Sequence, residues 1–431
     1  MKKILNNGLT IVLKSTSVDD QEVSLTFKCG HVNEPKIGIA AVYENIVKQN
    51  ASNLMSICGG SMTSFVTGVK TSITVAVKNL YDNCVAAAVT KKALNNAIED
   101  IVQHTKDLAP LPLRQAKLAY KHTAFGKNEV FWKTDDYIDK ISQLTVDDVK
   151  AYIADNFVAK NVVLGYCGPK KYFDSVVEVA EQYFGALATG KRKNINLEYT
   201  GGYQNIEGNG KMQIALFGWD ISKADNTAST NVLMSMLSGR LERSIGEAHL
   251  SAEAQVKIAG YFGLRTLRIA ISCANKKDYD KCIDIVCRNV KRLQTSEASD
   301  RRIETSRQRA MSERLGVSNE ALPRSVEIAW ALLGRDIDYD ADSAISNIWN
   351  VTAYDVQETA QVIFSKQMTC VFYTTQPFPS VEDIKDAMSA DSQSGERAAE
   401  AAEDPEFADA EPEFTDAERA AIERIDAQNA E

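Results

Sequence analysis

Glu44 is the residue of this chain whose type and setting most clearly suggest chemistry. It stands in the middle of residues 38–47, where Ala40, Ala41, Tyr43 and the following Ile-Val pair leave a helix little polar surface. A carboxylate in a mostly buried helix needs water, a charged partner or a metal ion to offset its lost hydration. The sequence therefore predicts a functional helix at residues 38–47.

Few histidines are available to hold a metal beside Glu44. The chain contains four, and no two have the spacing that places both imidazoles on one helical face. This excludes a local His-x-x-Glu-His zinc site, whereas a zinc ion held by distant His and Cys residues stays open. His31, in the loop before the helix, either approaches Glu44 or lies at the surface. The four histidines are His31, His104, His122 and His249.

Motifs for other chemistries are missing from the sequence. It contains no phosphate-binding glycine loop, no dinucleotide fingerprint after a strand and no Gly-x-Ser-x-Gly. Its eight cysteines are scattered through apolar segments without a Cys-x-x-Cys pair. We therefore expect buried free thiols rather than disulfides.

The elements that must position Glu44 alternate between strands and helices. An apolar strand at 23–29 and a polar loop at 31–36 lead into the helix, and a Gly-Gly turn at 59–60 follows it. Alternating residues then predict two antiparallel strands, at 62–67 and 72–77. Helical periodicity continues through much of the following chain, so the fold class is α+β.

A repeat organises the whole chain. Thr145 and Asp148 form a helix-capping pair that returns as Thr352 and Asp355, offset by 207 residues. In both places an N-capped helix is followed by a short turn and an apolar strand. Two similar halves are the simplest explanation of such a match.

Composition places the boundaries of these halves. Residues 191–210 are polar and rich in glycine, which is typical of an interdomain linker, and the chain becomes rich in Ala, Glu and Asp from residue 380. The expected organisation is therefore an N-terminal domain at 1–190, a linker at 191–210, a C-terminal domain at 211–378 and a tail at 379–431.

The net charge of −9 belongs to the tail. From residue 380 onward there are 17 acidic and four basic residues, whereas the remaining body has 45 basic and 41 acidic residues. The body has too small a basic excess to suggest nucleic-acid binding. The tail is either a disordered solubilising segment or one that carries a partner-docking helix at 415–427.

No apolar run reaches the roughly 18–20 residues that span a bilayer. The Lys pair at residues 2–3 is not followed by the apolar core of a signal peptide. On these grounds we expect a cytoplasmic protein without a membrane span.

Several segments together resemble the M16 (insulinase or pitrilysin-type) metallopeptidases, the family that includes the mitochondrial processing peptidase. None of the motifs is specific alone; their order and spacing make the resemblance, which covers roughly residues 5–375. The second half matches more loosely than the first. The segments are Asn-Gly-Leu-Thr-Ile-Val-Leu at 7–13, Cys-Gly-His-Val-Asn-Glu-Pro at 29–35, Gly-Ile-Ala at 38–40, Gly-Gly-Ser-Met-Thr-Ser-Phe-Val-Thr at 59–67, Thr-Ala-Phe-Gly at 123–126, 141–168, 231–233, 238–241 and 348–373.

The resemblance implies two similar domains, each a mixed β-sheet covered by helices, which close over an unfolded peptide. Active members carry an inverted zinc motif, His-x-x-Glu-His. In this chain the two histidine positions hold Ala41 and Asn45, and only Glu44, which would activate water, remains. A downstream acidic ligand would fall near Glu99. The second-domain Arg and Tyr that hold substrate carbonyls in the family align to residues 246–253, where this chain has Gly246, His249 and Glu253.

Without two imidazoles, no bound zinc can lower the pKa of its water, and a lone general base contributes only about 10²–10⁴-fold. The resemblance therefore implies a catalytically inactive subunit without a cofactor. It would form a heterodimer with an active M16 chain, or self-associate, and help to bind extended polypeptide.

The polypeptide would add to an edge strand at 62–66, unless this strand lies inside the sheet. The proposed binding residues are Met62, Thr63, Ser64, Phe65 and Val66. Two other functions stay open: a structural scaffold, like the core proteins of respiratory complexes, and a residual zinc metalloendopeptidase.

Overall fold

The structure, a computed structural model, divides into two compact units. Unit 1 contains residues 1–200, 260–265 and 322–340, and unit 2 contains 201–259, 266–321 and 341–431. The structure describes residues 1–15, 21–126, 134–193, 197–208, 210, 212–222, 227–261, 264–314, 324–335 and 341–389. The acidic segment from residue 390 onward, including the predicted helix at 415–427, lies outside the described residues.

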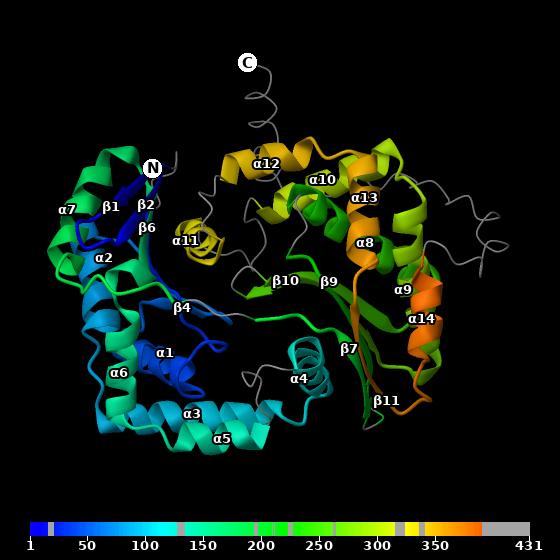
Figure 1. The fold of residues 1–431 in the computed structure, drawn as a ribbon, viewed down its shortest axis with the longest axis horizontal. Helices are drawn as coiled ribbons and strands as arrows, with labels where there is room; N and C mark the ends of the chain where they lie inside the picture. Colours follow the sequence, from blue (N-terminus) through cyan, green and yellow to red (C-terminus); the bar gives the residue numbers. More distant parts are fainter. Residues whose placement is uncertain are drawn as a thin grey trace. The chain divides into compact units, whose positions relative to one another are not determined.

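Unit 1 is built on a mixed sheet of six strands (Figure 1). Only β2 and β6 run parallel, and the other neighbours are antiparallel. In spatial order the strands are β1 (Lys2–Ile4), β2 (Thr10–Ser15), β6 (Val162–Gly168), β3 (Glu22–Phe27), β5 (Thr63–Gly68) and β4 (Met55–Cys58).

Unit 2 repeats this plan with five strands. As with β2 and β6 in unit 1, one pair is parallel, β7 and β11, and the next two pairs, β11 with β8 and β8 with β10, are antiparallel. The strands that correspond to β2, β6, β3, β5 and β4 of unit 1 are, in spatial order, β7 (Gly202–Glu207), β11 (Met368–Thr374), β8 (Gln213–Asp220), β10 (Leu264–Cys273) and β9 (Ala252–Tyr261). The predicted α+β fold of two similar halves is confirmed.

Helices cover both sheets. Those of unit 1 are α1 (Ile39–Asn50), α2 (Ile73–Leu80), α3 (Lys91–Leu108), α4 (Pro112–Phe125), α5 (Thr134–Ser142), α6 (Val146–Asn156), α7 (Phe173–Phe184) and α11 (Arg324–Arg335), with short turns at Tyr81–Val85, Ala159–Asn161 and Lys170–Tyr172. Those of unit 2 are α8 (Thr227–Glu247), α9 (Lys276–Thr295), α10 (Asp300–Arg314), α12 (Ala341–Trp349), α13 (Ala353–Phe364) and α14 (Val381–Met388). No helix among the described residues is both long and apolar enough to cross a membrane.

The capping pairs that suggested the repeat form as predicted. The Thr145 hydroxyl accepts the Asp148 N–H at 3.2 Å while the Asp148 carboxylate accepts the Thr145 N–H at 3.0 Å. Thr352 and Asp355 make the same reciprocal box at 3.1 and 2.8 Å. Each box satisfies two of the N–H groups that a helix start leaves without partners.

The core of unit 1 lies between its sheet and α1. Tyr43 of α1 is fully buried, and its ring lies 6.0 Å from Phe27, 5.8 Å from Phe65 and 5.5 Å from Tyr152. Its hydroxyl donates to the carbonyl of Cys84 at 2.8 Å. All eight cysteines are free, as predicted, and only Cys58 is more than marginally exposed.

Helix α11 covers the other face of the same sheet. Successive strand side chains alternate between faces, so Ile11 and Leu13 enter the core beneath α1 while Val12 packs with Leu332 of α11. The Trp330 indole N–H donates to the Ser64 hydroxyl at 2.8 Å. Both faces of this sheet are therefore buried within unit 1.

Two local expectations were wrong. The predicted linker at 191–210 contains β7, the first strand of the second sheet, whose polar sequence fits an edge strand paired only with β11 among the described residues. The predicted strand at 72–77 is the start of α2. The Ser72 hydroxyl accepts the Val75 N–H there and caps a helix, despite the β-branched residues that follow.

Candidate functional site

The site helix α1 begins at a glycine that no other residue can replace easily. Gly38 has a φ of 77°, and a Cβ on it would lie 2.1 Å from Cγ1 of Ile141. This conformation and this close approach both favour glycine. Gly38 therefore fixes where α1 starts and how closely it approaches the helix α5 that carries Ile141.

The carboxyl group of Glu34 holds the start of the helix. Glu34 accepts the N–H of Gly38 at 2.6 Å on one oxygen and the N–H of Ala40 at 3.0 Å on the other. Burial raises the pKa of Glu34 to about 8, although both hydrogen bonds act in the opposite direction. The cost of desolvating the charge is thus larger here than the gain from the two donors.

Glu44 lies on the more exposed face of α1, and its carboxylate is already occupied. Ala41, Glu44 and Asn45 are all half-buried and share this face. Oε1 of Glu44 accepts the Ser56 hydroxyl at 2.6 Å and pairs with the Lys48 ammonium at 2.9 Å. Neither imidazole nor metal is needed to satisfy this acid, since a hydroxyl and a cation do so.

His31 belongs to the same region rather than to the open surface. Its Nε2 lies 3.6 Å from Sγ of Cys58, whose sulfur also accepts the Thr63 hydroxyl at 3.5 Å. Burial, followed by the charge of Lys121, lowers the pKa of His31, while Glu44 acts to raise it. Of the two possibilities left by the sequence, the structure favours an approach of His31 toward Glu44.

The His31–Cys58 pair is not an activated nucleophile. Burial and then the Glu44 charge hold the pKa of the Cys58 thiol far above its usual range. The thiolate is the reactive form, and it needs a neighbouring positive charge to be stable at neutral pH. A neutral imidazole and a protonated thiol can form a hydrogen bond, but they do not supply the thiolate that covalent catalysis requires.

Zinc does not fit the residues that occupy the family's metal positions. Ala41 offers no donor atom, the Asn45 amide accepts a hydrogen bond from Gln49 at 2.7 Å, and Glu44 is paired with Lys48. Zn²⁺ requires three or four N, S or O ligands in a tetrahedral arrangement. Within the described ranges, no group of three His, Cys, Asp or Glu residues could hold a metal ion.

Glu99, aligned with the family's acidic ligand, lies elsewhere. It is exposed on α3, whereas Leu94 and Ala97 of that helix are buried in the core. A residue two positions from Ala97 points to the opposite side of a helix. The expected placement of a third ligand at Glu99 is therefore not supported.

The proposed binding strand at 62–66 is not an edge strand. Residues 63–66 belong to β5, which pairs with β3 on one side and with β4 on the other. The edge-strand interpretation of Met62, Thr63, Ser64, Phe65 and Val66 is wrong, because β4 uses the backbone groups that an incoming peptide would need. The edges of the described sheet are β1 and β4, and on β4 Met55 is 49% exposed.

The aligned second-domain positions lie in unit 2, where the chain passes from α8 to β9. His249 is exposed and has a φ of 50°, the left-handed region that is uncommon for residues other than glycine. Gly246 and Glu253 are also exposed. The structure supplies neither an arginine nor a tyrosine at these three positions.

Sequence reasoning overlooked Glu34 and Ser56. An acid four residues before a glycine at a helix start is a signal that could have indicated the Glu34 cap. Ser56 had no such signal, because its contact with Glu44 depends on how β4 returns along α1.

These features define an α+β protein of two repeated units whose helix α1 lacks a set of metal ligands. Residues 143–310 match the family model described as the Peptidase M16 inactive domain. With this match, the resemblance seen in the sequence is confirmed for residues 143–310.

Solved structures have the same fold. A chain of complex III2 from Candida albicans, determined with Inz-5 bound, is 14% identical with a TM-score of 0.74, covering 90% of this chain and 99% of that one. A protease from Helicobacter pylori is 14% identical with a TM-score of 0.73, covering 88% of this chain and 99% of that one. No curated protein sequence matches the chain.

Proposed function

We propose that the chain is a catalytically inactive M16-type subunit that pairs with an active zinc-peptidase chain and helps to bind extended polypeptide. The observation that carries the proposal is the more exposed face of α1, where Glu44 is bound by Ser56 and Lys48. The two histidine positions of the zinc motif hold Ala41, which has no atom that could bind a metal, and the amide Asn45. The partner supplies the zinc and its activated water. This chain supplies binding surface.

Metal analysis and peptidase assays of the purified chain test the inactive half of the proposal. We expect less than stoichiometric zinc and no hydrolysis of unfolded peptides, with the same result for Glu44→Gln. Stoichiometric zinc together with hydrolysis that is lost in Glu44→Gln would instead establish a residual metalloendopeptidase and refute the proposal.

Co-purification tests the pairing. We expect a companion chain that carries an intact His-x-x-Glu-His motif, with peptide hydrolysis only in the mixture of the two. Glu44→Gln of this chain should leave the activity of the mixture unchanged, whereas the matched change in the companion should abolish it. A chain that stays monomeric in the presence of such a companion would contradict the pairing.

Strand β4 is the best candidate for polypeptide binding. Among the described residues it pairs only with β5, so its other side can accept an extended backbone. Successive residues of a strand direct their N–H groups to opposite sides of the strand. Proline has no N–H, so of the variants Ser56→Pro and Ile57→Pro one loses an N–H that faces β5 and the other loses an N–H that faces the open side of β4. The variant that loses the N–H on the open side should weaken peptide binding without unfolding the sheet. Equal peptide affinity in that variant, once it is shown to be folded, would refute strand addition at β4.

A scaffold subunit is the second candidate, favoured by the similarity of the fold to a chain of complex III2. It predicts stoichiometric incorporation into a larger complex and no saturable binding of unfolded peptide in a titration. The inactive partner predicts saturable binding, so the same titration separates the two.

A further inference from the structure

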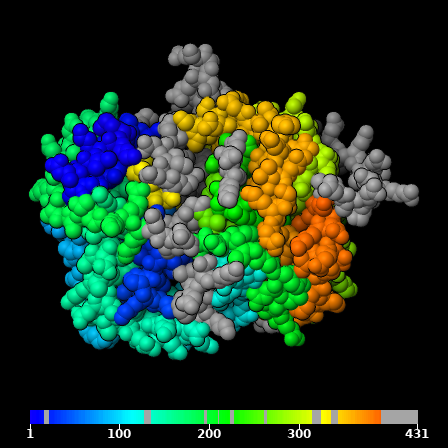
Figure 2. Space-filling view, in the orientation of Figure 1, coloured from blue at the N-terminus to red at the C-terminus, as the bar shows by residue number. Residues whose placement is uncertain are grey.

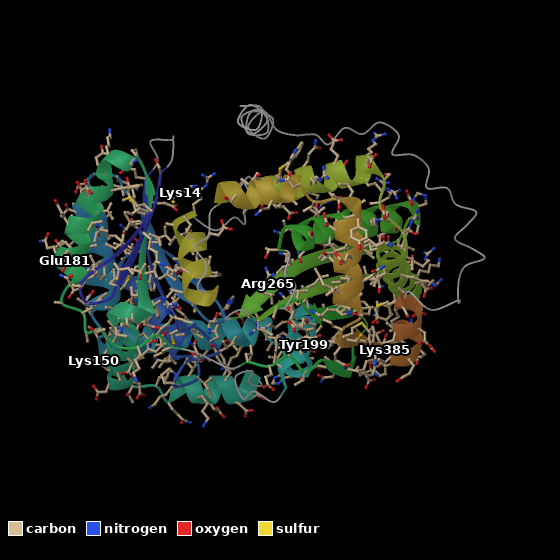
Figure 3. The ribbon with its side chains drawn as sticks, turned by 45° about the horizontal axis from the view of Figure 1, so that its top comes forward. Lys14, Lys150, Glu181, Tyr199, Arg265 and Lys385 are labelled. Carbon is tan, nitrogen blue, oxygen red and sulfur yellow. The ribbon has the colours of Figure 1, made fainter. Side chains whose placement is uncertain are left out.

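Unit 2 contains a cavity that the proposed function does not use. It lies where the first half of α10, the end of α12 and the start of α13 meet, and its volume is about 340 Å³. Helices α10 and α12 lie side by side (Figure 1), and α12 and α13 form part of the surface of unit 2 (Figure 2). Figure 3 shows α10 and α12 at the opposite end of unit 2 from Lys385 of α14. Ligand sites have volumes of about 300–1,000 Å³, so this cavity suits a small ligand.

The base and one wall of the cavity are apolar. Ile303 of α10 is buried, Ala353 is the first residue of α13, and Trp349 is the last residue of α12. Trp349 is half-buried and packs against the core of unit 2, which holds its ring in place. A fixed indole offers an apolar face to the side chain of a ligand, and aromatic ligands stack on it well.

Two carboxylates line the same cavity at its exposed end. Asp300 and Glu304 are four residues apart on α10, so their side chains share one face of the helix. Both residues are exposed. Among the described residues, neither carboxylate makes a hydrogen bond or an ion pair. Both are therefore available to a positively charged group of a ligand.

A guanidinium group lines the cavity beside these acids. Nε of Arg307 donates to the carbonyl of Val351 at 2.6 Å, which fixes the side chain at the turn between α12 and α13. Within the ranges that the structure describes, its two Nη groups make no hydrogen bond or ion pair. Glu304 is three residues earlier, a spacing that allows a pair with Arg307, yet the two do not pair. Each of these opposite charges is thus left for a ligand.

The nearest other acid is already engaged. Thr352 lines the cavity, and its hydroxyl donates to the Asp355 carboxylate at 2.7 Å within the capping box of α13. The hydrogen bonds from Thr352 lower the pKa of Asp355, and the charge of Arg307 lowers it further. Asp355 therefore balances part of the Arg307 charge without using the Nη donors.

This combination of groups suits a ligand that carries both charges. A cation alone would meet the guanidinium, and an anion alone would meet the two carboxylates. An α-amino acid carries its ammonium and its carboxylate on one carbon atom. Glu304 and Arg307 are separated by about 4.5 Å along α10, at 1.5 Å per residue, so their side chains can reach both charges of such a ligand. Charge-assisted hydrogen bonds at both ends would then fix its orientation.

We propose that the cavity between α10, α12 and α13 binds a free α-amino acid with an apolar or aromatic side chain. The ammonium group of the amino acid binds Asp300 and Glu304, and its carboxylate binds the Nη groups of Arg307. Its side chain lies against Trp349 and Ile303.

Calorimetric titration of the full-length chain with L-phenylalanine tests the proposal. Two analogues each lack one charge: phenethylamine has no carboxylate, and 3-phenylpropionate has no ammonium group. We expect saturable binding of L-phenylalanine with a Kd of about 1 mM or tighter, which is ordinary for a ligand of this size. Each analogue should bind about tenfold more weakly, the factor that corresponds to one charged hydrogen bond.

Two variants assign the charges to their residues. Glu304→Gln should weaken binding of L-phenylalanine by about tenfold and reduce its advantage over 3-phenylpropionate, because the ammonium loses a partner. Arg307→Gln should instead reduce the advantage of L-phenylalanine over phenethylamine. The matched control is Glu358→Gln, which removes the same charge from an exposed position of α13 outside the cavity and should leave all three affinities unchanged. Circular dichroism melting establishes that each variant is folded.

Three results would overturn the proposal. The first is no saturable binding of L-phenylalanine by the wild-type protein. The second is phenethylamine or 3-phenylpropionate binding as tightly as L-phenylalanine, which would assign the cavity to a simple cation or anion. The third is equal affinity for L-phenylalanine in folded Glu304→Gln and Glu358→Gln, which would place the binding elsewhere. None of these measurements needs a companion chain or an unfolded peptide, so the proposal can fail while the proposed function stands.

Discussion

Replacing Glu34 with glutamine should change how the stability of the protein depends on pH. Burial raises the pKa of Glu34 from 4.5 to about 8 in the folded protein. Below pH 4.5 the carboxyl is protonated in both states, and its stabilising contribution is complete. Between pH 4.5 and 8 the unfolded chain ionises while the folded chain keeps its proton, so this contribution is lost as the pH rises.

The size of the effect follows from the same interval. Each pH unit between 4.5 and about 8 corresponds to about 1.4 kcal/mol, so the free energy of unfolding should fall by at most about 5 kcal/mol across it. In Glu34→Gln this dependence is absent. At pH 5 the variant should be close to the wild type in stability, because the protonated carboxyl and the amide each offer one carbonyl acceptor to the N–H groups of Gly38 and Ala40.

Urea unfolding at fixed ionic strength, at half-unit steps from pH 4.5 to 8.5, measures both quantities. The difference between wild type and variant cancels groups that titrate equally in both. Amide exchange of the α1 backbone gives a local check on the same helix. Parallel curves for the two proteins, or a wild type that gains stability relative to the variant as the pH rises, would refute the assignment of a protonated Glu34.

Three further substitutions test the surroundings of α1. His31→Gln should reduce the loss of stability below pH 6.5 in urea titrations. Burial lowers the pKa of His31 in the folded protein, so the unfolded chain takes up the proton more readily as the pH falls; the same loss of stability in variant and wild type would contradict this. Gly38→Ala should lower the free energy of unfolding by about 2–4 kcal/mol, since its Cβ would meet Ile141 in a left-handed backbone, and a loss below about 1 kcal/mol would argue against that geometry. Trp330→Phe should cost about 1 kcal/mol through the hydrogen bond to Ser64, and a double-mutant cycle with Ser64→Ala should show coupling; additive effects would mean that this bond contributes nothing.

Local patterns predicted much of the fold. The capping boxes at Thr145 and Thr352 depend on residues three positions apart, so they are visible in the sequence, and they located the repeat. The two sheets then followed the same strand order, with β11 in the place of β6. Strand β7 was missed because a half-exposed edge strand can be polar on both sides, which removes the alternation that marks a strand.

The candidate site was predictable only in part. The lost ligands at Ala41 and Asn45 are visible in the sequence, but the partners of Glu44 are not, because Ser56 reaches it from a neighbouring strand. The interior position of β5 depends on β4, a strand of four residues whose pairing no local pattern fixes. What the sequence could not provide was the set of contacts between residues of different elements.

The strand order also determines when each sheet can be completed during synthesis. β6 lies between β2 and β3, yet it is the last strand of its sheet to leave the ribosome, and β11 is likewise the last strand of the second. A nascent chain that ends before residue 162 has β2 and β3 without the partner that joins them, and such unpaired strands promote aggregation. Val12 and Val163 remain without the cover of α11 until residue 335 has been made. High contact order of this kind is associated with slow folding, so the first unit depends for its final closure on a segment encoded within the second half of the chain.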